Sequence, residues 1–472
     1  MNTTDTGASH PSWLWGALSA MGKPPEGTLF ARDTAIPLCE LTQRSLLGSH
    51  LEALRGRCVL LAVRDQLTAA LALLELDGVA RRLVLCPPDL AAAHVPHVVA
   101  TSAAEGWVGD ADGPPAGCAP ALSATVRSPA LSEHIGVRRQ SHATEWVLLT
   151  SGTSGVPKLV LHTLATLTSA LTRRPAARSS ALWSTFYDIR RYGGLQIFLR
   201  AMHIGSLVLS AADEPVADFV TRARTAGVTH ISGTPSHWRR MLMSGAAAML
   251  QPRYVRLSGE IADQAVLDSL RAAYPQALIA HAFASTEAGV AFEVGDGVAG
   301  FPACLLQEPA AGVELRVADG TLQIRSPGNA LRYLDAGAAP LRRADGFVDT
   351  GDRVELRDGR YHFMGRAGGV INVGGLKVHP EEVEAVINSH PWVRMSLARG
   401  RSSPITGAVV TAEVVLAEPL GGRGERPSPE ALTRELLERC KRALPPHKVP
   451  AMIRIVPALK VSESGKLVRP NA

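Results

Sequence analysis

Aromatic residues make up only 5% of this 472-residue chain, and long hydrophobic runs are missing altogether. No stretch approaches the roughly 18 uncharged apolar residues that a membrane-spanning helix needs. The first residues, "MNTTDTGASHPSWLWGALSAMGK", have neither a positively charged start nor a sustained apolar segment, so they do not resemble a secretory signal. We therefore expect a cytoplasmic protein without a membrane span.

Cysteines are few, and charge of one sign is not concentrated anywhere. The six cysteines lie at positions 39, 58, 86, 118, 304 and 440 and form no C-x-x-C pair, which argues against zinc sites and a disulfide framework. Lys+Arg 49 against Asp+Glu 43 leaves a net charge of only +6, and the arginines are scattered as pairs. We expect reduced thiols and no nucleic-acid partner.

The first part of the chain alternates two kinds of segment. From about residue 50 to 285, short apolar runs such as "RCVLLAV" (57–63) and "RRLVLC" (81–86) alternate with longer segments such as "DQLTAALALLEL". Buried strands that alternate with helices predict a parallel sheet covered on both faces. At about 100–200 residues per domain, the chain is long enough for two to four subdomains.

The pattern changes from about residue 310. Alternating segments with Asp-Gly turns at 319–320 and 358–359 predict antiparallel hairpins. Farther on, Pro380 predicts the start of a helix, a second helix follows at about 429–443, and a last strand at 452–456. The predicted fold class is α/β, with a large N-terminal domain of packed α/β sheets plus a β-rich subdomain (1–366) and a small mobile α+β C-terminal domain (367–472).

The stretch "TSGTSGVPK" (150–158) combines hydroxyl side chains, two glycines and a lysine. Its order, G-x-x-G-x-x-K with Pro157 before the lysine, does not match the Walker A loop. Backbone N–H groups freed by glycine, hydroxyl donors and a lysine can nevertheless wrap a polyphosphate. A surface turn rich in small residues is the alternative interpretation.

A second stretch, "HAFASTEAG" (281–289), follows the expected strand "ALIA" at the sheet edge where open α/β sheets bind ligands. There the Thr286 hydroxyl can bond a phosphate, the Glu287 carboxylate can hold Mg²⁺, and Phe283 can stack on a base. The alternative is an ordinary strand-to-loop transition with a helix-capping threonine.

Two further stretches carry charged side chains. In "GFVDTGDRVE" (346–355), Asp352 stands at the expected end of a turn, where its carboxylate is suited to accept two ribose hydroxyl bonds; a turn-forming Asp is the alternative. In "LKVSESGKLVRP" (459–470), a Ser-Gly turn presents Lys466 near the chain end, and a solvated terminal lysine is the alternative.

These four stretches, in this order, resemble the motifs of the adenylate-forming superfamily of acyl-CoA synthetases, adenylation domains and luciferases. "RLSGE" (256–260) is similar to the family's adenine-contacting segment, and "VINVGGLKVHPEEVE" (370–384) to the motif that follows the hinge in its CoA ligases. The resemblance spans nearly the whole chain and is nearest to the o-succinylbenzoate and aryl-CoA ligase branch. It implies an AMP-forming acid:CoA ligase that uses ATP, Mg²⁺ and CoA through an acyl-adenylate.

The resemblance implies a role for each matching residue. The β- and γ-phosphates would be held by Thr150, Ser151, Gly152, Thr153, Ser154, Gly155 and Lys158. The adenine would be framed by Ser258, Gly259, Glu260 and Phe283, with the α-phosphate at Thr286, Mg²⁺ at Glu287 and the ribose at Asp352 and Arg366. Gly374 and Gly375 would approach the pantetheine chain of CoA, and Lys466 would be the catalytic lysine that bridges the substrate carboxylate and the α-phosphate.

The expected hinge departs from the usual family sequence, and the expected acid-binding segment differs between branches of the family. Gly368 stands where the hinge usually has an Asp, which implies a looser pivot. Aligned by the spacing from Gly194 to Gly205, Tyr192 takes the place of the Asp that binds an α-amino group, which disfavours an amino-acid substrate. Arg191, or its neighbour Arg190, could pair with a second anionic group of the acid, and an intramolecular ion pair is the alternative. An aryl or short acid is expected.

Other functions stay open at this level. A freestanding adenylation enzyme that loads an acyl group onto the phosphopantetheine of a carrier protein would share every residue above. A catalytically silent nucleotide-binding protein would need a missing catalytic residue, and none is missing. The expected partners are a small carboxylic acid and CoA or an acyl carrier protein; whether the chain forms a homodimer stays open.

Overall fold

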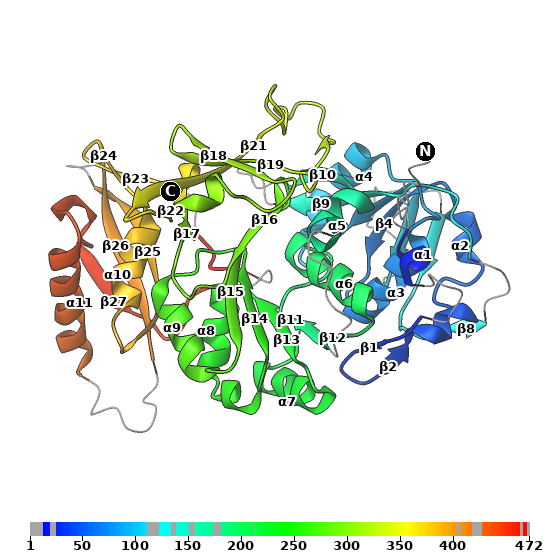
Figure 1. Ribbon diagram of the computed structural model, residues 1–472, viewed down its shortest axis with the longest axis horizontal. Helices are drawn as coiled ribbons and strands as arrows, with labels where there is room; N and C mark the ends of the chain where they lie inside the picture. The colour runs from blue at the N-terminus through cyan, green and yellow to red at the C-terminus, as the bar shows by residue number, and fades with distance from the viewer. Residues whose placement is uncertain are drawn as a thin grey trace, which may run out of the picture. The chain divides into compact units, whose positions relative to one another are not determined.

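The structure is a computed structural model that describes residues 13–18, 25–110, 122–133, 138–150, 156–172, 181–211, 213–403, 407–417, 427–462 and 466–469. The chain forms two compact units, shown with their elements in Figure 1. The first is Met1–Asp213 with Pro327–Leu341, and the second is Glu214–Ser326 with Arg342–Ala472. The domain boundary expected at 366/367 lies inside the second unit and stays a prediction.

The first unit is built on a seven-stranded sheet whose order is β20-β10-β9-β5-β4-β6-β7. Its strands are β4 (Cys58–Ala62), β5 (Arg82–Leu85), β6 (Gly106–Gly109), β7 (Leu122–Thr125), β9 (Glu145–Thr150), β10 (Lys158–Thr163) and β20 (Arg332–Tyr333). The strands from β9 to β7 run parallel, whereas β10 and β20 are antiparallel to their neighbours. The parallel part is the sheet predicted from the alternation of apolar runs and helices.

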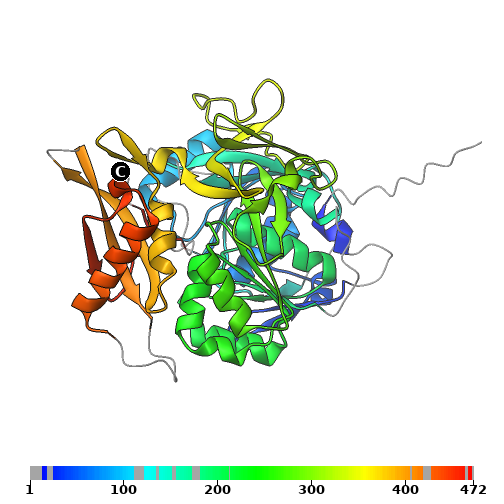
Figure 2. The same cartoon turned by 60° about the vertical axis from the view of Figure 1, so that its left-hand side comes forward.

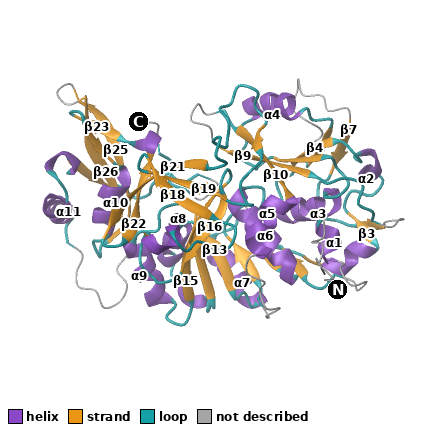
Figure 3. Cartoon of the chain, turned by 45° about the horizontal axis from the view of Figure 1, so that its top comes forward, coloured by secondary structure: helices purple, strands orange, loops and turns teal. Residues whose placement is uncertain are grey.

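Helices cover both faces of this sheet (Figure 3). On one face, α4 (Val95–Ser102) packs Val95 and Val98 against apolar strand residues. On the other face lie α3 (Gln66–Leu76), α5 (Leu164–Thr172) and α6 (Tyr192–Ile204). Every residue of α3 is buried, as expected for a helix that is apolar on all sides.

Smaller elements complete the first unit. A second set of strands has the order β2-β1-β12-β11, and β3 pairs with β8. The bounds are β1 (Thr28–Phe30), β2 (Ala35–Pro37), β3 (Arg44–Ser45), β8 (Ser132–Glu133), β11 (Trp183–Thr185), β12 (Leu207–Leu209), α1 (Leu14–Leu18) and α2 (His50–Ala53).

In the second unit, three parallel strands end at one edge. They are β13 (His230–Gly233), β14 (Tyr254–Ser258) and β15 (Leu278–Ser285), and β16 (Gly289–Val294) adds antiparallel to β15. The helices α7 (Val216–Ala226), α8 (Pro235–Met243) and α9 (Gln264–Ala273) accompany them.

An antiparallel sheet with the order β17-β22-β21-β19-β18 follows. Its bounds are β17 (Phe301–Pro302), β18 (Glu314–Ala318), β19 (Thr321–Arg325), β21 (Val348–Arg357) and β22 (Arg360–Arg366). Asp319 (φ 53°) and Asp358 (φ 49°), each followed by a glycine at φ 74°, adopt the left-handed conformation at the two hairpin turns. The predicted Asp-Gly hairpins are therefore present.

The last part of the chain has its own apolar core. It contains β23 (Ile371–Val373), β24 (Leu376–Val378), α10 (Pro380–Asn388), β25 (Val393–Ser403), β26 (Gly407–Leu416), α11 (Pro429–Ala443) and β27 (Met452–Ile455). Helices α10 and α11 pack beside the sheet of β25, β26 and β27 (Figure 2), with residues such as Val383, Leu436 and Val414 in the shared core. Helix α11 begins where predicted, because Ser428 caps it and Pro429 occupies its first turn.

Two expectations concern the described residues as a whole. In the part of the chain that the structure describes, no helix is both long and apolar enough to cross a membrane. The cysteines found there, Cys39, Cys58, Cys86, Cys304 and Cys440, are free thiols, and three of them are buried.

Candidate active site

The carboxyl ends of β14 and β15 bring two of the sequence motifs together. Ser258, the last residue of β14, pairs with Ala282 of β15, which directly precedes Phe283. Gly259 follows with a left-handed φ of 85°, a conformation that glycine adopts without strain. Thr286 and Glu287 lie in the turn between β15 and β16. Strand β15 extends to Ser285, so Phe283 lies inside the strand rather than after it.

Phe283 belongs to a group of stacked rings. Its ring lies 5.5 Å from that of Phe363 at an interplanar angle of 9° and 5.8 Å from that of Phe292 at 25°. These offset arrangements are the ones that aromatic pairs favour. Phe283, the residue predicted to stack on the adenine, therefore packs against the sheet that contains β22.

Lys466 approaches the same edge from the far end of the chain. The segments 460–462 and 466–468 pair as a small antiparallel hairpin, here called the Lys466 hairpin, through a bridge between Val461 and Leu467. A Cβ atom added at Gly259 would lie 3.4 Å from Cε and 3.8 Å from Nζ of Lys466. The lysine side chain thus passes over Gly259 at a distance that would give a Cβ there an ordinary van der Waals contact.

Asp352 and Arg366 lie opposite each other on β21 and β22. Asp352 is inside strand β21, which corrects the expectation that it stands at the end of a turn. The Nε atom of Arg366 lies 3.3 Å from Oδ1 of Asp352, and its guanidinium also donates to the Thr350 carbonyl at 2.8 Å. Burial raises the pKa of the Asp352 carboxyl above its ordinary value, and the charges of Arg366 and Lys466 only partly offset this shift. Asp352 is thus a pre-oriented acceptor within electrostatic range of the lysine.

Glu287 is the residue predicted to hold Mg²⁺. Among the described residues, no group of three His, Cys, Asp or Glu side chains could hold a metal ion. Mg²⁺ at nucleotide sites is commonly bound by one or two carboxylates together with substrate phosphates. A single carboxylate beside Thr286 therefore fits an ion that arrives with a nucleotide.

Gly374 and Gly375 form the two-residue turn between β23 and β24. Val373 pairs with Leu376, and both glycines have positive φ, 58° and 86°. This is the conformation of a tight hairpin turn that suits glycine. In the segment predicted to be the hinge, Gly365 lies so close to α10 that an added Cβ would be 2.3 Å from a carboxylate oxygen of Glu381.

In the first unit, the predicted phosphate loop connects two paired strands. Thr150, at the end of β9, pairs directly with Lys158, at the start of β10. The ammonium of Lys158 lies 5.0 Å from the centre of the Tyr333 ring, within range of a cation–π contact. Ser151, Gly152, Thr153, Ser154 and Gly155 lie outside the described residues.

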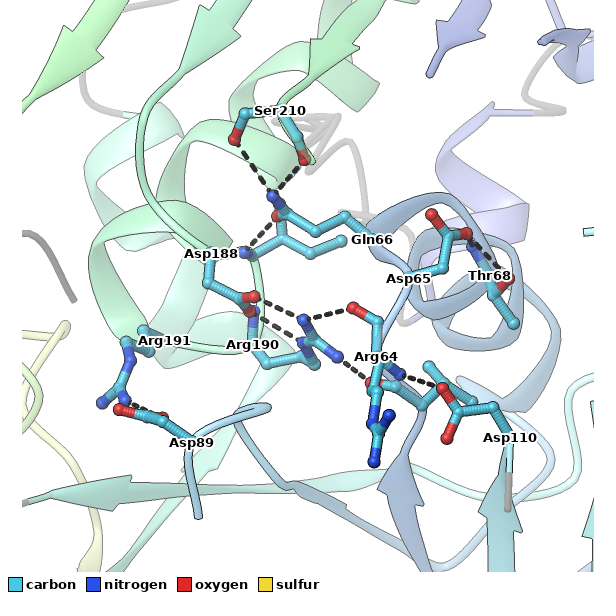
Figure 4. A network of polar contacts seen from close by, with 12 residues as sticks. Arg64, Asp65, Gln66, Thr68, Asp89, Asp110, Asp188, Arg190, Arg191 and Ser210 are labelled. Atoms are coloured by element: carbon cyan, nitrogen blue, oxygen red, sulfur yellow. Dashed lines mark hydrogen bonds and ion pairs between the residues drawn. The ribbon is translucent and has the colours of Figure 1, made fainter. Parts of the chain in front are cut away.

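Of the two adjacent arginines, Arg190 is enclosed and Arg191 is not. The Arg190 side chain is fully buried, and it donates to the Asp188 carboxylate and to the carbonyls of Val63 and Arg64 (Figure 4). Arg191 forms an ion pair with Asp89, and its side chain is 26% exposed. Arg190 therefore has a structural role. For Arg191, the intramolecular ion pair that was the alternative interpretation is present.

The same segment holds Tyr192 and Gly194, the other two residues used to predict the acid-binding segment. The buried Tyr192 lies with its ring 5.7 Å from that of His162. A Cβ at Gly194 would be 2.1 Å from the Asp188 carbonyl, so this position in the first turn of α6 admits only glycine. Gln66 holds the segment in place, because its amide accepts from the Ile189 N–H at 2.9 Å and donates to the Ser210 carbonyl (Figure 4).

Sequence reasoning missed three residues that shape the surroundings of Lys466. Ser236, in the first turn of α8, donates to Glu260 through its N–H and its hydroxyl. Arg469 donates to both carboxylate oxygens of Glu384 at 2.8 and 2.7 Å. These contacts join segments far apart in the chain, so no local pattern could have indicated them.

Comparison with protein families gives two matches. The AMP-binding enzyme model matches residues 60–334, and the model of the AMP-binding enzyme C-terminal domain matches residues 382–466. The 2-succinylbenzoate–CoA ligase of Salmonella typhimurium is 31% identical over 258 residues, which cover 52% of this chain and 53% of that protein. The human mitochondrial acyl-coenzyme A synthetase ACSM5 is 39% identical over 139 residues, which cover 29% and 23%. The matches thus span about a quarter to a half of these relatives.

Solved structures resemble the chain over nearly its full length. An anthranilate CoA ligase in complex with anthranoyl-AMP has a TM-score of 0.77 at 19% identity and covers 97% of this chain and 96% of its own. The o-succinylbenzoate CoA synthetase of Bacillus subtilis, in complex with its acyl-adenylate intermediate, has a TM-score of 0.73 at 20% identity, with 97% of both chains covered. These similarities confirm the predicted fold class.

Proposed function

Because the chain belongs to the AMP-binding enzyme family, we propose that it activates a carboxylic acid with ATP and then transfers the acyl group to the thiol of CoA. One observation carries this proposal: Lys466 passes over Gly259, so that a cation from the end of the chain reaches the edge where the parallel strands end. Open α/β sheets bind their ligands at such an edge.

The proposed chemistry has two steps. First, a carboxylate oxygen of the acid attacks the α-phosphorus of ATP, an acyl–O–P linkage forms, and the bond to the β-phosphate breaks with release of pyrophosphate. Second, the CoA sulfur attacks the acyl carbon, a C–S bond forms, AMP leaves with the former carboxylate oxygen, and the thiol proton passes to solvent. Neither step needs a nucleophilic side chain, so the protein acts by orienting and by charge.

The first step brings two anions together, and the site supplies positive charge against their repulsion. We assign Lys466 to the substrate carboxylate and the α-phosphate, and Lys158 with the 150–155 loop to the β- and γ-phosphates. Mg²⁺ held by Glu287 and the phosphates would offset the charge that develops on pyrophosphate. Preorganised charges of this kind are commonly the largest catalytic contribution, about 3–4 kcal/mol for a single donor.

The remaining residues orient the nucleotide and the acid. Asp352 and Arg366 suit the ribose hydroxyls, and Thr286 suits the α-phosphate. Tyr192 offers no carboxylate for an α-amino group, which supports an aryl or short acid rather than an amino acid. The relatives named for 2-succinylbenzoate and anthranilate agree with this choice.

The test is acid-dependent pyrophosphate release from Mg-ATP, measured for aryl, short-chain and dicarboxylic acids with and without CoA. We expect multiple turnovers and an acyl-CoA product only when CoA is present, and a loss of about 10²- to 10³-fold in Lys466→Ala. Release limited to one equivalent with and without CoA would indicate a carrier protein as the acceptor. Full adenylate formation by Lys466→Ala would overturn the assignment of the lysine.

A further inference from the structure

The Lys466 hairpin is a short two-stranded element. Its main-chain bonds run from Ser462 N–H to the Lys466 carbonyl at 2.8 Å and from Val468 N–H to the Lys460 carbonyl at 3.0 Å, and the Ser462 hydroxyl adds bonds to the Lys466 carbonyl and N–H. An isolated two-stranded hairpin is only marginally stable in water. Contacts between the hairpin and other segments of the protein therefore help to set the position of the Lys466 ammonium.

Glu260 binds that outer edge. Its Oε1 atom accepts the Leu467 N–H at 2.9 Å, a contact between residues separated by 207 positions. The same carboxylate accepts the Ser236 hydroxyl at 3.1 Å and, through Oε2, the Ser236 N–H at 2.9 Å. Ser236 lies in the first turn of α8, where backbone N–H groups and the helix dipole favour an anion. Its two bonds to Glu260 therefore orient the carboxylate independently of the hairpin.

A second carboxylate holds the far end of the segment. Arg469 is bidentate to Glu384 on α10, and Glu384 also accepts the Ala398 N–H at 2.8 Å. Two anchors thus follow Lys466 in the chain, one at Leu467 and one at Arg469. The anchor at Leu467 connects the hairpin to the nucleotide-binding edge, because Glu260 follows Gly259 directly.

We propose that Glu260 is a positioning residue that acts through Lys466: it docks the lysine hairpin on the nucleotide-binding edge for adenylate formation. This inference rests on the proposed function. The adenine contact implied for this segment would then come from the backbone of Gly259 and Glu260, since the carboxylate already accepts three donors.

Its kinetic test uses Glu260→Ala and Glu260→Gln, with Ser236→Ala as the matched control. Ser236→Ala removes one bond to Glu260 but leaves the Leu467 contact. We expect Glu260→Ala to slow single-turnover adenylate formation about 10- to 100-fold with the KM for ATP changed less than about threefold. Gln, whose amide oxygen still accepts, should restore most of the rate, and Ser236→Ala, which keeps the Ser236 N–H bond to Glu260, should slow the reaction less than Glu260→Ala. A raised KM with an unchanged rate would overturn the proposal.

A double-mutant cycle tests whether Glu260 works through the lysine. In a Lys466→Ala background, Glu260→Ala should cause no further loss of adenylate formation, because there is no ammonium left to position. If the two losses multiply instead, Glu260 acts on the nucleotide independently and the proposal is wrong.

Amide hydrogen exchange tests the docking without reference to activity. Peptides covering 460–469 should exchange faster in Glu260→Ala than in the unmodified protein, and Ser236→Ala should not show this change. Unchanged exchange in Glu260→Ala would refute the docking even if the ligase activity is present. Conversely, absence of pyrophosphate release with every acid would refute the proposed function, while faster exchange would still support the docking.

Discussion

The Arg190 cluster and the Lys466 hairpin are both held by charged side chains, but in different ways. Arg190 is fully buried, and its guanidinium is satisfied by Asp188 and by main-chain carbonyls next to β4. The hairpin is held by the half-buried Glu260 and by Arg469, which is 36% exposed. A buried charge with every bond made is costly to separate from its partners, whereas the half-buried hydrogen bond between Glu260 and Leu467 costs less to break. The first cluster shapes the start of α6, and the second carries Lys466.

The largest effect is expected from breaking the buried cluster. Arg190→Met leaves the Asp188 carboxylate without its cation in a closed environment, which should lower the free energy of unfolding by about 3–5 kcal/mol. The measurement is denaturant unfolding of the variant beside Arg191→Ala, the neighbouring arginine whose partner is at the surface. A loss below about 1 kcal/mol for Arg190→Met would remove the distinction between the two regions.

A pH-dependent effect is expected on the helix turn that supports Glu260. The Nδ1 atom of His237 accepts the Thr234 N–H at 3.1 Å, and burial, with the charge of Arg240, lowers the pKa of His237 to about 3. The unfolded chain binds this proton near its ordinary pKa of about 6.5, so the stability is fully present above pH 6.5 and is lost as the pH falls toward 3. At pH 5 the loss should be roughly 2 kcal/mol, at about 1.4 kcal/mol per pH unit.

His237→Gln separates this effect from general acid unfolding. Glutamine at this position can still accept the Thr234 N–H in a capping box but does not titrate. The stability of the variant should therefore change less between pH 6.5 and 4 than that of the unmodified protein. Parallel curves for the two proteins would show that His237 does not contribute.

A smaller and more selective effect is expected at the second anchor of the hairpin. Arg469→Gln removes the bidentate bond to Glu384 and should slow adenylate formation about tenfold, or roughly 1.4 kcal/mol. The glutamine amide and the Ala398 N–H can still donate to the buried Glu384 carboxylate, so the free energy of unfolding should fall by less than in Arg190→Met. Arg442→Gln, on the exposed side of α11, is the control. If Arg469→Gln destabilised the fold as strongly as Arg190→Met, both clusters would be scaffolds.

The family and the main elements could be predicted because their signals are local. The motif from Thr150 to Lys158, the Asp-Gly turns and the Ser428-Pro429 helix start are each written in a few neighbouring residues, and the family prediction is confirmed. The contacts that place the lysine are not local. Glu260 and Leu467 lie 207 positions apart, and the hydrogen bond uses a main-chain N–H that every residue except proline carries.

Two residues show why a pattern alone could not assign the acid-binding segment. Arg190 and Arg191 are adjacent and chemically identical, and only the crossing of the chain past β4 decides that the first is enclosed. Gly194 matched the family spacing, but its physical requirement is the close approach of the Asp188 carbonyl. The roles of Arg191, Tyr192 and Gly194 toward the acid stay predictions.

The smallest effect on stability, and the sharpest on specificity, is expected at Arg191. Its ion pair with Asp89 is partly exposed, so Arg191→Ala should change the free energy of unfolding by less than about 1 kcal/mol. If Arg191 binds a second anionic group of the acid, the variant should lose kcat/KM for dicarboxylic acids more than for monocarboxylic ones. Asp89→Asn is the matched control, because it releases the guanidinium without removing it and should preserve or increase the preference for dianions. Equal losses for both classes in Arg191→Ala would leave the arginine a surface ion pair, and the start of α6 would then belong to the scaffold alone.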